Sequence, residues 1–233
     1  MIDIHTHILP YIDDGSDSSQ ISIELLKEAQ KQGVTDVFLT PHYRLRYKRE
    51  KTEIVEIFEK FCDEVKKENL NVNLYLGQEI YYSRSIRQLI SNGNLLSLNN
   101  SKYVLVEFSY MSSSEIDEMI YEITLLGYVP VLAHVERFDF VSIGLIKQLK
   151  SLGALVQINA GSLFAGRFSS SKRKAKKLLK LGLVDFVASD VHSFRPNYLQ
   201  KANEFIAKKF GRDVANKLFI ENAKKVINNQ DII

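Results

Sequence analysis

Two histidines stand two residues apart near the start of the chain, directly after a short apolar segment. Ile2 and Ile4 suit a buried β-strand, and the side chains of His5 and His7 would project from the same face of that strand. Both imidazoles could therefore bind one metal ion. A His-x-His sequence can also be an ordinary polar pair at a strand end, so the tripeptide alone leaves both interpretations open.

Other histidines and several carboxylates also stand at or just beyond the ends of predicted strands. The candidate metal ligands, which include all five histidines of the chain, are His5, His7, Asp14, His42, Glu79, Glu107, His134, Asp190 and His192. A single such carboxylate is more often a helix cap or a solvated side chain. Nine candidates together favour a metal cluster, because carboxylates without a neutralising charge would repel one another.

The ligand types and their number indicate which ions could bind. Imidazoles and carboxylates without thiolates suit manganese, iron or zinc, and nine ligands exceed what one ion can use. We therefore expect two or three divalent ions, manganese first among them. Such ions lower the pKa of bound water toward neutrality and clamp the attacking and leaving oxygens of a phosphoryl group, so the predicted chemistry is phosphate ester hydrolysis by a metal-activated hydroxide.

Two arginines lie close to these histidines in the sequence. Arg137 stands three residues after His134, and Arg195 stands three residues after His192. A guanidinium binds phosphate as a fork and stabilises charge in the transition state, so both are candidate catalytic residues. The alternative is that both are exposed surface arginines. Arg44 and Arg46, in a basic loop over residues 43–51, are weaker candidates for the rim of the site.

Helices and strands are predicted to alternate along the chain. Strands are expected over residues 2–4, 37–39, 72–79, 103–106, 129–133, 154–158 and 184–188. Helices are expected over or around residues 17–33, 54–65, 83–90, 116–123, 172–180, 198–210 and 213–228. Four helices end on glycine, at Gly33, Gly127, Gly153 and Gly182, which is typical of a repeated αβ unit.

This alternation predicts the fold class. Strands that are apolar at nearly every position indicate a parallel sheet buried on both faces. We predict an α/β fold, a distorted (β/α)7 barrel with parallel strands, as one domain over residues 1–233. An open doubly wound sheet is the second possibility, although no glycine-rich dinucleotide loop follows the first strand.

Composition excludes several kinds of protein. The net charge of +3 does not call for nucleic acid, and no apolar stretch approaches the roughly 20 residues that span a bilayer. We expect a cytoplasmic protein without membrane insertion. The one cysteine, Cys62, allows no intramolecular disulfide and lies among predicted core positions, which argues against a role as nucleophile.

A lysine-rich segment over residues 172–180 could suggest nucleic-acid binding. Ala175, Leu178, Leu179 and Leu181 instead form an apolar stripe, which makes the lysines the solvated face of a helix. An acidic protein partner remains a possible use of the positive charge.

Several motifs resemble those of a known group. They lie at residues 2–10, 13–15, 40–42, 77–79, 107–108, 134–137, 161–163 and 188–192. Together they resemble the polymerase and histidinol phosphatase (PHP) superfamily and, within it, the bacterial tyrosine-protein phosphatases of capsule and exopolysaccharide operons. The resemblance covers the whole chain.

The resemblance implies specific ligand sets. One ion would be bound by His5, His7, Glu79 and Asp190, a second by Glu79, Glu107 and His134, and a third by Asp14, His42 and His192. It also implies a substrate, the phosphorylated tyrosine-rich C-terminal tail of a bacterial tyrosine kinase that controls polysaccharide export. A histidinol-phosphate-type small-molecule phosphatase and a binding module with structural metals remain alternatives. The oligomeric state stays open.

Overall fold

The structure is a computed structural model that describes all residues of the chain except 45–46, 48, 83–91, 109–112 and 233. Every pair of hydrogen-bonded strands is parallel. The described strands are β1 (Ile2–Thr6), β2 (Asp36–Leu39), β3 (His42–Tyr43), β4 (Asn73–Leu76), β5 (Glu79–Tyr81), β6 (Tyr103–Glu107), β7 (Val129–Leu132), β8 (Leu155–Asn159) and β9 (Phe186–Ala188).

The strands form two sheets that continue one another into a distorted barrel. One sheet has the order β1-β2-β4 and the other the order β3-β5-β6-β7-β8-β9. A parallel bridge between Thr6 and Val191 connects the ends of the first and the last strand. The α/β class and the parallel strands of the predicted barrel are therefore confirmed, because strands and helices alternate as the sequence pattern indicates.

The chain leaves the strand conformation at two places that the sequence did not predict. Thr40 and Pro41 separate β2 from β3, and Gly77 and Gln78 separate β4 from β5. A Cβ atom on Gly77 would lie 2.8 Å from the Leu98 side chain, so the chain passes too close to Leu98 for a larger residue. After the interruptions, β3 and β5 pair with each other.

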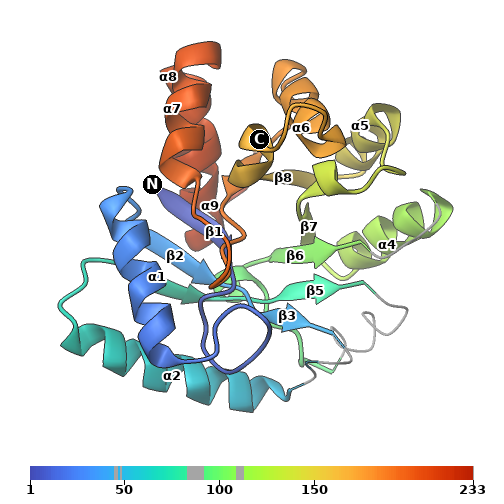
Figure 1. Cartoon of the computed structure of the whole chain (residues 1–233). Coiled ribbons are helices and arrows are strands. Elements are labelled where there is room, and N and C mark those ends of the chain that lie inside the picture. Colours follow the sequence, from blue (N-terminus) through green and yellow to red (C-terminus); the bar gives the residue numbers. More distant parts are fainter. Residues whose placement is uncertain (45–46, 48, 83–91, 109–112, 233) are drawn as a thin grey trace.

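Helices cover the outside of the barrel (Figure 1). They are α1 (Ser19–Lys31), α2 (Lys51–Lys67), α4 (Ser113–Leu125), α5 (Ile143–Ser151), α6 (Ser170–Lys180), α7 (Leu199–Phe210), α8 (Arg212–Asn216) and α9 (Asn222–Ile227). A π-helical turn at Lys217–Glu221 connects α8 to α9, so the helix predicted over residues 213–228 is continuous but locally wider. The helix predicted over residues 83–90 lies outside the described residues.

Short 3₁₀ turns and glycines shape the connections. The turns η3 (Val135–Arg137) and η4 (Ala160–Phe164) follow β7 and β8, and η2 (Leu98–Asn100) precedes β6. The four glycines predicted to end helices all have positive φ, between 65° and 97°, as a helix C-terminal glycine requires.

The lysine-rich helix α6 presents its apolar side to the protein. Ala175, Leu178 and Leu179 are buried, as predicted, whereas Leu181 is 45% exposed. The prediction for Leu181 was wrong because this residue follows the last helical turn and no longer continues the buried stripe.

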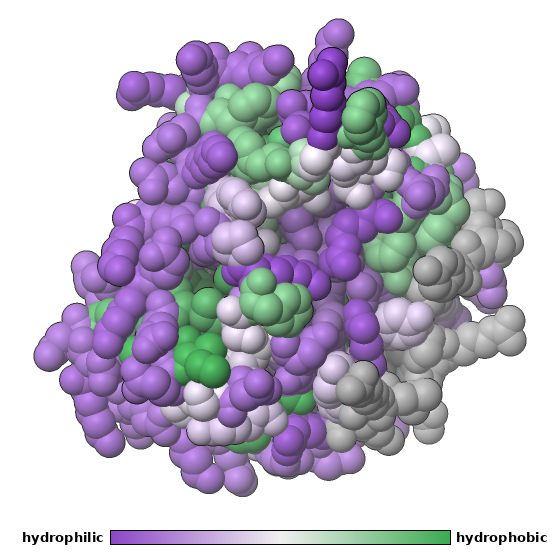
Figure 2. Space-filling model, viewed as in Figure 1, coloured by the Kyte–Doolittle hydropathy of each residue, from purple (hydrophilic) through white to green (hydrophobic). Residues whose placement is uncertain are grey.

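The surface seen in Figure 2 is largely hydrophilic, with apolar side chains in separate patches. Within the part of the chain that the structure describes, no helix is long and apolar enough to cross a membrane. Cys62 is half-buried on α2, and burial raises the pKa of its thiol, which makes it a poor nucleophile.

Candidate metal centre and active site

The nine candidate ligands converge at the carboxyl ends of the strands. Eight are buried, and the most exposed of these eight, Glu107, has an exposed fraction of only 8%. The side chain of Asp14, in the loop after β1, is 47% exposed. Parallel strands carry their carboxyl ends to the same side of a barrel, which explains how residues far apart in sequence meet here.

Glu79 lies at the centre of the cluster. Its Oε1 is 2.7 Å from His134 Nε2 and 3.5 Å from His5 Nε2. Its Oε2 is 2.6 Å from His42 Nδ1 and 3.4 Å from His7 Nε2. The register of β3 and β5 pairs His42 with Glu79 directly. Burial alone would raise the pKa of Glu79, but the surrounding histidines hold that pKa well below its usual value.

The third group of candidates lies beside His7. Asp14 Oδ1 is 3.7 Å from His42 Nε2 and 3.7 Å from His192 Nε2. The His7 and His192 rings stack, with centroids 4.2 Å apart. Burial and the neighbouring His7 lower the pKa of His192 to about 4, so this imidazole is neutral near pH 7 and can offer a lone pair.

Hydrogen bonds fix the orientation of the first two histidines. His5 Nδ1 is 3.2 Å from Gln157 Oε1, and His7 Nδ1 is 2.7 Å from Asp13 Oδ2. Gln157 Oε1 also accepts from the His134 backbone N–H, which confirms that this atom is the oxygen of the amide. Both Nδ1 atoms therefore donate, and in the neutral rings the Nε2 atoms carry the lone pairs.

These lone pairs make the cluster suitable for cations. His5 Nε2 and His7 Nε2 lie only 3.1 Å apart, a distance at which two unprotonated nitrogens repel one another unless a proton or a metal ion lies between them. Among the described residues, the buried His134 Nδ1 has no hydrogen-bond partner, and His42 Nδ1 and Glu79 Oε2 contact each other at 2.6 Å without the geometry of a hydrogen bond. The donor set thus fits divalent metal ions.

Four overlapping groups have ligand atoms that all lie within 4.8 Å of one another. They are His7, Asp14, His42 and His192; His5, His7 and Asp190; His5, Glu79 and His134; and His42, Glu79 and Glu107. These groups contain all nine candidates. They overlap the three ligand sets that the resemblance implies but differ from each. The first lacks Glu79, the second has His5 in place of Glu107, and the third gains His7, while Glu107 groups with Glu79 and His42.

The loop after β1 is held close to the cluster by a glycine. A Cβ atom on Gly15 would lie 2.1 Å from the His7 carbonyl oxygen, so only glycine allows this approach. The backbone N–H groups of Gly15 and His42 donate to Asp13, which also binds His7. His7 lowers the pKa of the buried Asp13 to about 2, although burial opposes the shift, and the carboxylate stays charged.

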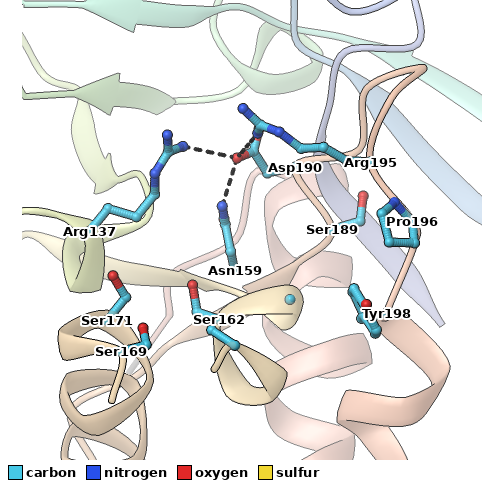
Figure 3. A pocket seen from close by; sticks show the side chains of 12 residues that line it. Arg137, Asn159, Ser162, Ser169, Ser171, Ser189, Asp190, Arg195, Pro196 and Tyr198 are labelled. Carbon is cyan, nitrogen blue, oxygen red and sulfur yellow. Dashed lines mark hydrogen bonds and ion pairs between the residues drawn. The ribbon is translucent and has the colours of Figure 1, made fainter. Parts of the chain in front are cut away.

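The two predicted arginines lie on either side of Asp190 (Figure 3). Arg137 Nη1 is 3.2 Å from Asp190 Oδ2, and Arg195 Nη1 is 2.9 Å from the same oxygen. Asn159 Nδ2 donates to this oxygen as well, at 2.6 Å. The other oxygen of Asp190, Oδ1, is 3.4 Å from His7 Nε2. Asp190 therefore faces the histidines with one oxygen and the arginines with the other.

Arg44, a weaker candidate in the sequence, forms an ion pair with Glu107. Its guanidinium carbon also lies 5.2 Å from the centre of the Tyr81 ring. Arg44 thus neutralises the most exposed of the buried candidate carboxylates, a role that the sequence did not predict. Arg46 lies outside the described residues.

The residues that orient the ligands were not predicted from the sequence. Asp13 appeared only within the motif at residues 13–15, and Gln157, Asn159 and Glu136 were not selected. One signal was available, because Gln157 and Asn159 are polar residues two apart in the otherwise apolar strand β8. Glu136 accepts from the Asn159 backbone N–H and from Ser162, contacts that no local pattern indicates.

The fold and the cluster define a class, the parallel β/α barrels with histidine and carboxylate side chains suited to metal ions at the carboxyl ends of the strands. Within that class, residues 1–228 match the family described as capsular polysaccharide synthesis, CpsB/CapC, and the chain belongs to this family.

Curated relatives cover the full length of the chain. Tyrosine-protein phosphatase CpsB of Streptococcus agalactiae is 34% identical over 100% of both chains. Tyrosine-protein phosphatase YwqE of Bacillus subtilis is 36% identical over 100% of this chain and 93% of its own length. Putative tyrosine-protein phosphatase CapC of Staphylococcus aureus is 37% identical with the same coverage.

Solved structures agree with the fold. A chain from the crystal structures of B. subtilis YwqE and Streptococcus pneumoniae CpsB, described as unique metal-dependent tyrosine phosphatases, matches with a TM-score of 0.93 and 34% identity over 100% of this chain and 96% of that one. The phosphotriesterase homology protein of Escherichia coli matches with a TM-score of 0.61 at 14% identity over 97% of this chain and 96% of its own, a likeness of fold alone.

Proposed function

We propose that the protein is a metal-dependent protein-tyrosine phosphatase, a phosphoric monoester hydrolase that acts in capsular or exopolysaccharide synthesis. The observation that carries this proposal is the buried cluster around Glu79, in which four histidines surround one carboxylate. Membership of the CpsB/CapC family and relatives named tyrosine-protein phosphatases support this function over a histidinol-phosphate-type activity.

The cluster holds two or three divalent ions in this proposal, with manganese favoured over iron or zinc. The ligands are His5, His7, Asp14, His42, Glu79, Glu107, His134, Asp190 and His192, with Glu79 shared between ions. When bound, such ions supply positive charge that polarises a phosphoryl group and acidifies water.

The protein's own groups prepare the site for this chemistry. Gln157 and Asp13 hold His5 and His7 with their Nε2 lone pairs toward the centre, so no ring has to rotate before it binds. The positive charges of Arg137 and Arg195, at the edge beside Asp190, stabilise negative charge on the phosphoryl oxygens. Both arginines therefore act as catalytic residues in this proposal.

The depth of the cluster favours phosphotyrosine as the substrate. The central ligands are fully buried, whereas Arg137 and Arg195 at the edge have side chains that are 42% and 36% exposed. A phosphotyrosine carries its phosphate far from the peptide backbone on a rigid ring, whereas phosphoserine would bring the backbone against the rim. A flexible, phosphorylated tail of a bacterial tyrosine kinase meets this requirement and is the proposed protein substrate.

A side-by-side assay tests the proposal. Metal-loaded protein should hydrolyse a phosphotyrosine peptide with a much higher kcat/KM than the matched phosphoserine peptide or histidinol phosphate. Removal of bound metal by exhaustive chelation should abolish turnover, and added Mn²⁺ should restore it. Equal efficiency on the two peptides would contradict the depth argument, and a better rate with histidinol phosphate would assign the small-molecule activity instead.

A further inference from the structure

A pocket of about 400 Å³ lies on the arginine side of Asp190. Its lining includes Arg137 and Arg195, together with the side chains of Asn159, Ser162, Ser169 and Ser171 (Figure 3). None of the five histidines lines it, so Asp190 is the one candidate ligand that the pocket shares with the cluster. The pocket therefore lies beside the cluster, and Asp190 and the two arginines border both.

The charged side chains of the pocket leave an excess of positive charge. Arg137 and Arg195 contribute two positive charges and Asp190 contributes one negative charge. Asp190 Oδ2 already accepts from both arginines and from Asn159. A guanidinium has five N–H donors, and the single contact that each arginine makes with Asp190 through Nη1 leaves donors for a further acceptor.

Hydroxyl groups and lysines add to the same environment. The Ser169 Oγ accepts from the backbone N–H of Lys172, so the proton of this hydroxyl is available to a ligand. Lys172 Nζ donates to the carbonyl of Ala165, itself a lining residue, which places another positive charge beside the pocket. Donors from several separate elements thus surround a space that has more positive than negative charge.

We propose that this pocket binds a second anionic group of the substrate, the carboxylate of an acidic side chain or a second phosphate on the same peptide. This inference rests on the proposed function, because it concerns the peptide whose phosphotyrosine reacts at the cluster. The arginines connect the two positions: each guanidinium lies beside Asp190 at the edge of the cluster and also lines the pocket. The pocket selects peptides in which a second negative charge accompanies the phosphotyrosine.

Binding measurements separate the two sources of the charge. Peptides would carry a non-hydrolysable phosphonate in place of the reacting phosphotyrosine and, at each flanking position in turn, alanine, glutamate or phosphotyrosine. Fluorescence anisotropy with the Mn²⁺-loaded protein should give a Kd about tenfold lower for the best peptide with a second anion than for its alanine counterpart, as one charge-assisted hydrogen bond would produce. Equal Kd values for all peptides would overturn the inference.

Two neighbouring serines provide a matched pair of variants. Ser170 and Ser171 both lie in the first turn of α6, where an acidic residue is favourable for the helix, but only Ser171 lines the pocket. Ser171→Asp should reduce the preference for the second anion about tenfold through repulsion of like charges, and Ser170→Asp, whose side chain is exposed, should leave it unchanged. An equal effect of both substitutions would show a general charge effect and would also overturn the inference.

Turnover distinguishes the inference from the proposed function. If the protein hydrolyses a singly phosphorylated peptide but shows no preference for a second anion, the pocket assignment fails and the phosphatase assignment stands. If it hydrolyses no phosphotyrosine peptide under metal-loaded conditions, the proposed function fails, and the binding data still report whether the pocket holds an anion.

Discussion

The two sides of Asp190 differ in burial and in chemistry. On the side of Oδ1, His5 and His7 are fully buried and are held by the hydrogen bonds that they donate to Gln157 and Asp13. On the side of Oδ2, Arg137 and Arg195 are partly exposed and converge on a single oxygen. One carboxylate thus separates a rigid, buried cluster from an open, positively charged pocket.

This difference indicates that the two sides of Asp190 have different functions. Buried imidazoles held by partners can keep the geometry that metal ions require, since rearrangement would break several hydrogen bonds at once. Partly exposed arginines can instead adjust to substrates of different shape, and solvent screens each of their interactions. We therefore expect substitutions on the buried side to have larger effects than substitutions on the open side.

Substitution of Glu79 should have the largest effect on activity, and it is the strictest test of the buried side of Asp190. Replacement of Glu79 by alanine should lower kcat/KM on an aryl phosphate about a thousandfold, because the loss of a central buried carboxylate leaves several histidines without their counterpart. Bound metal should fall in parallel. Asp14→Ala, in the exposed loop, should cost about tenfold; equal and mild losses for both variants would contradict a central role for Glu79.

Gln157 tests whether the orienting hydrogen bonds matter. Gln157→Leu keeps the size of the side chain but removes the acceptor for His5 Nδ1, and it should weaken metal affinity about 10-fold to 100-fold, as measured by titration with a competing chelator. The surface substitution Gln148→Leu on α5 is the matched control. If both variants bind metal like the unsubstituted protein, orientation by Gln157 is unimportant.

Substitution of Arg137 tests the partly exposed side of Asp190. Arg137→Ala should lower turnover about tenfold on both phosphotyrosine and phosphoserine peptides, since it removes one stabilising charge whose partial exposure limits its contribution. Metal content should stay the same, which separates this variant from Glu79→Ala. Arg173→Ala, in the exposed part of α6, serves as the control, and a loss of bound metal in Arg137→Ala would remove the distinction between the two sides.

Cys62 should give the smallest effect. It lies on α2, away from the candidate ligands, and burial raises the pKa of its thiol. Cys62→Ser should retain activity within about a factor of two, because hydrolysis at a metal cluster requires no phosphocysteine. Isolation of a phosphorylated Cys62 by mass spectrometry after rapid quenching would refute this mechanism.

The spacing of apolar residues was sufficient to predict most helices and strands. The order of the strands also predicted that the candidate metal ligands lie close together. Apolar segments with period-two or period-3.6 spacing report burial along a single element, and the carboxyl ends of parallel strands must meet on one side of the sheet. His134 and Glu107 could therefore be placed together without knowledge of their contacts. The spacing of apolar residues did not predict the break at Gly77, where the backbone passes close to Leu98, a contact between residues distant in the sequence.

The sequence by itself determined the class of fold, the positions of nine candidate ligands and the two arginines beside them, since all of these depend on residue type and spacing within short segments. Only the tertiary structure shows that Asp13 and Gln157 orient His7 and His5, and that Asp190 lies between the cluster of candidate ligands and the pocket. The physical reason is that a hydrogen bond is specified by the relative position of two atoms. His5 and Gln157 are 152 residues apart in the chain, and packing of the whole barrel brings them together.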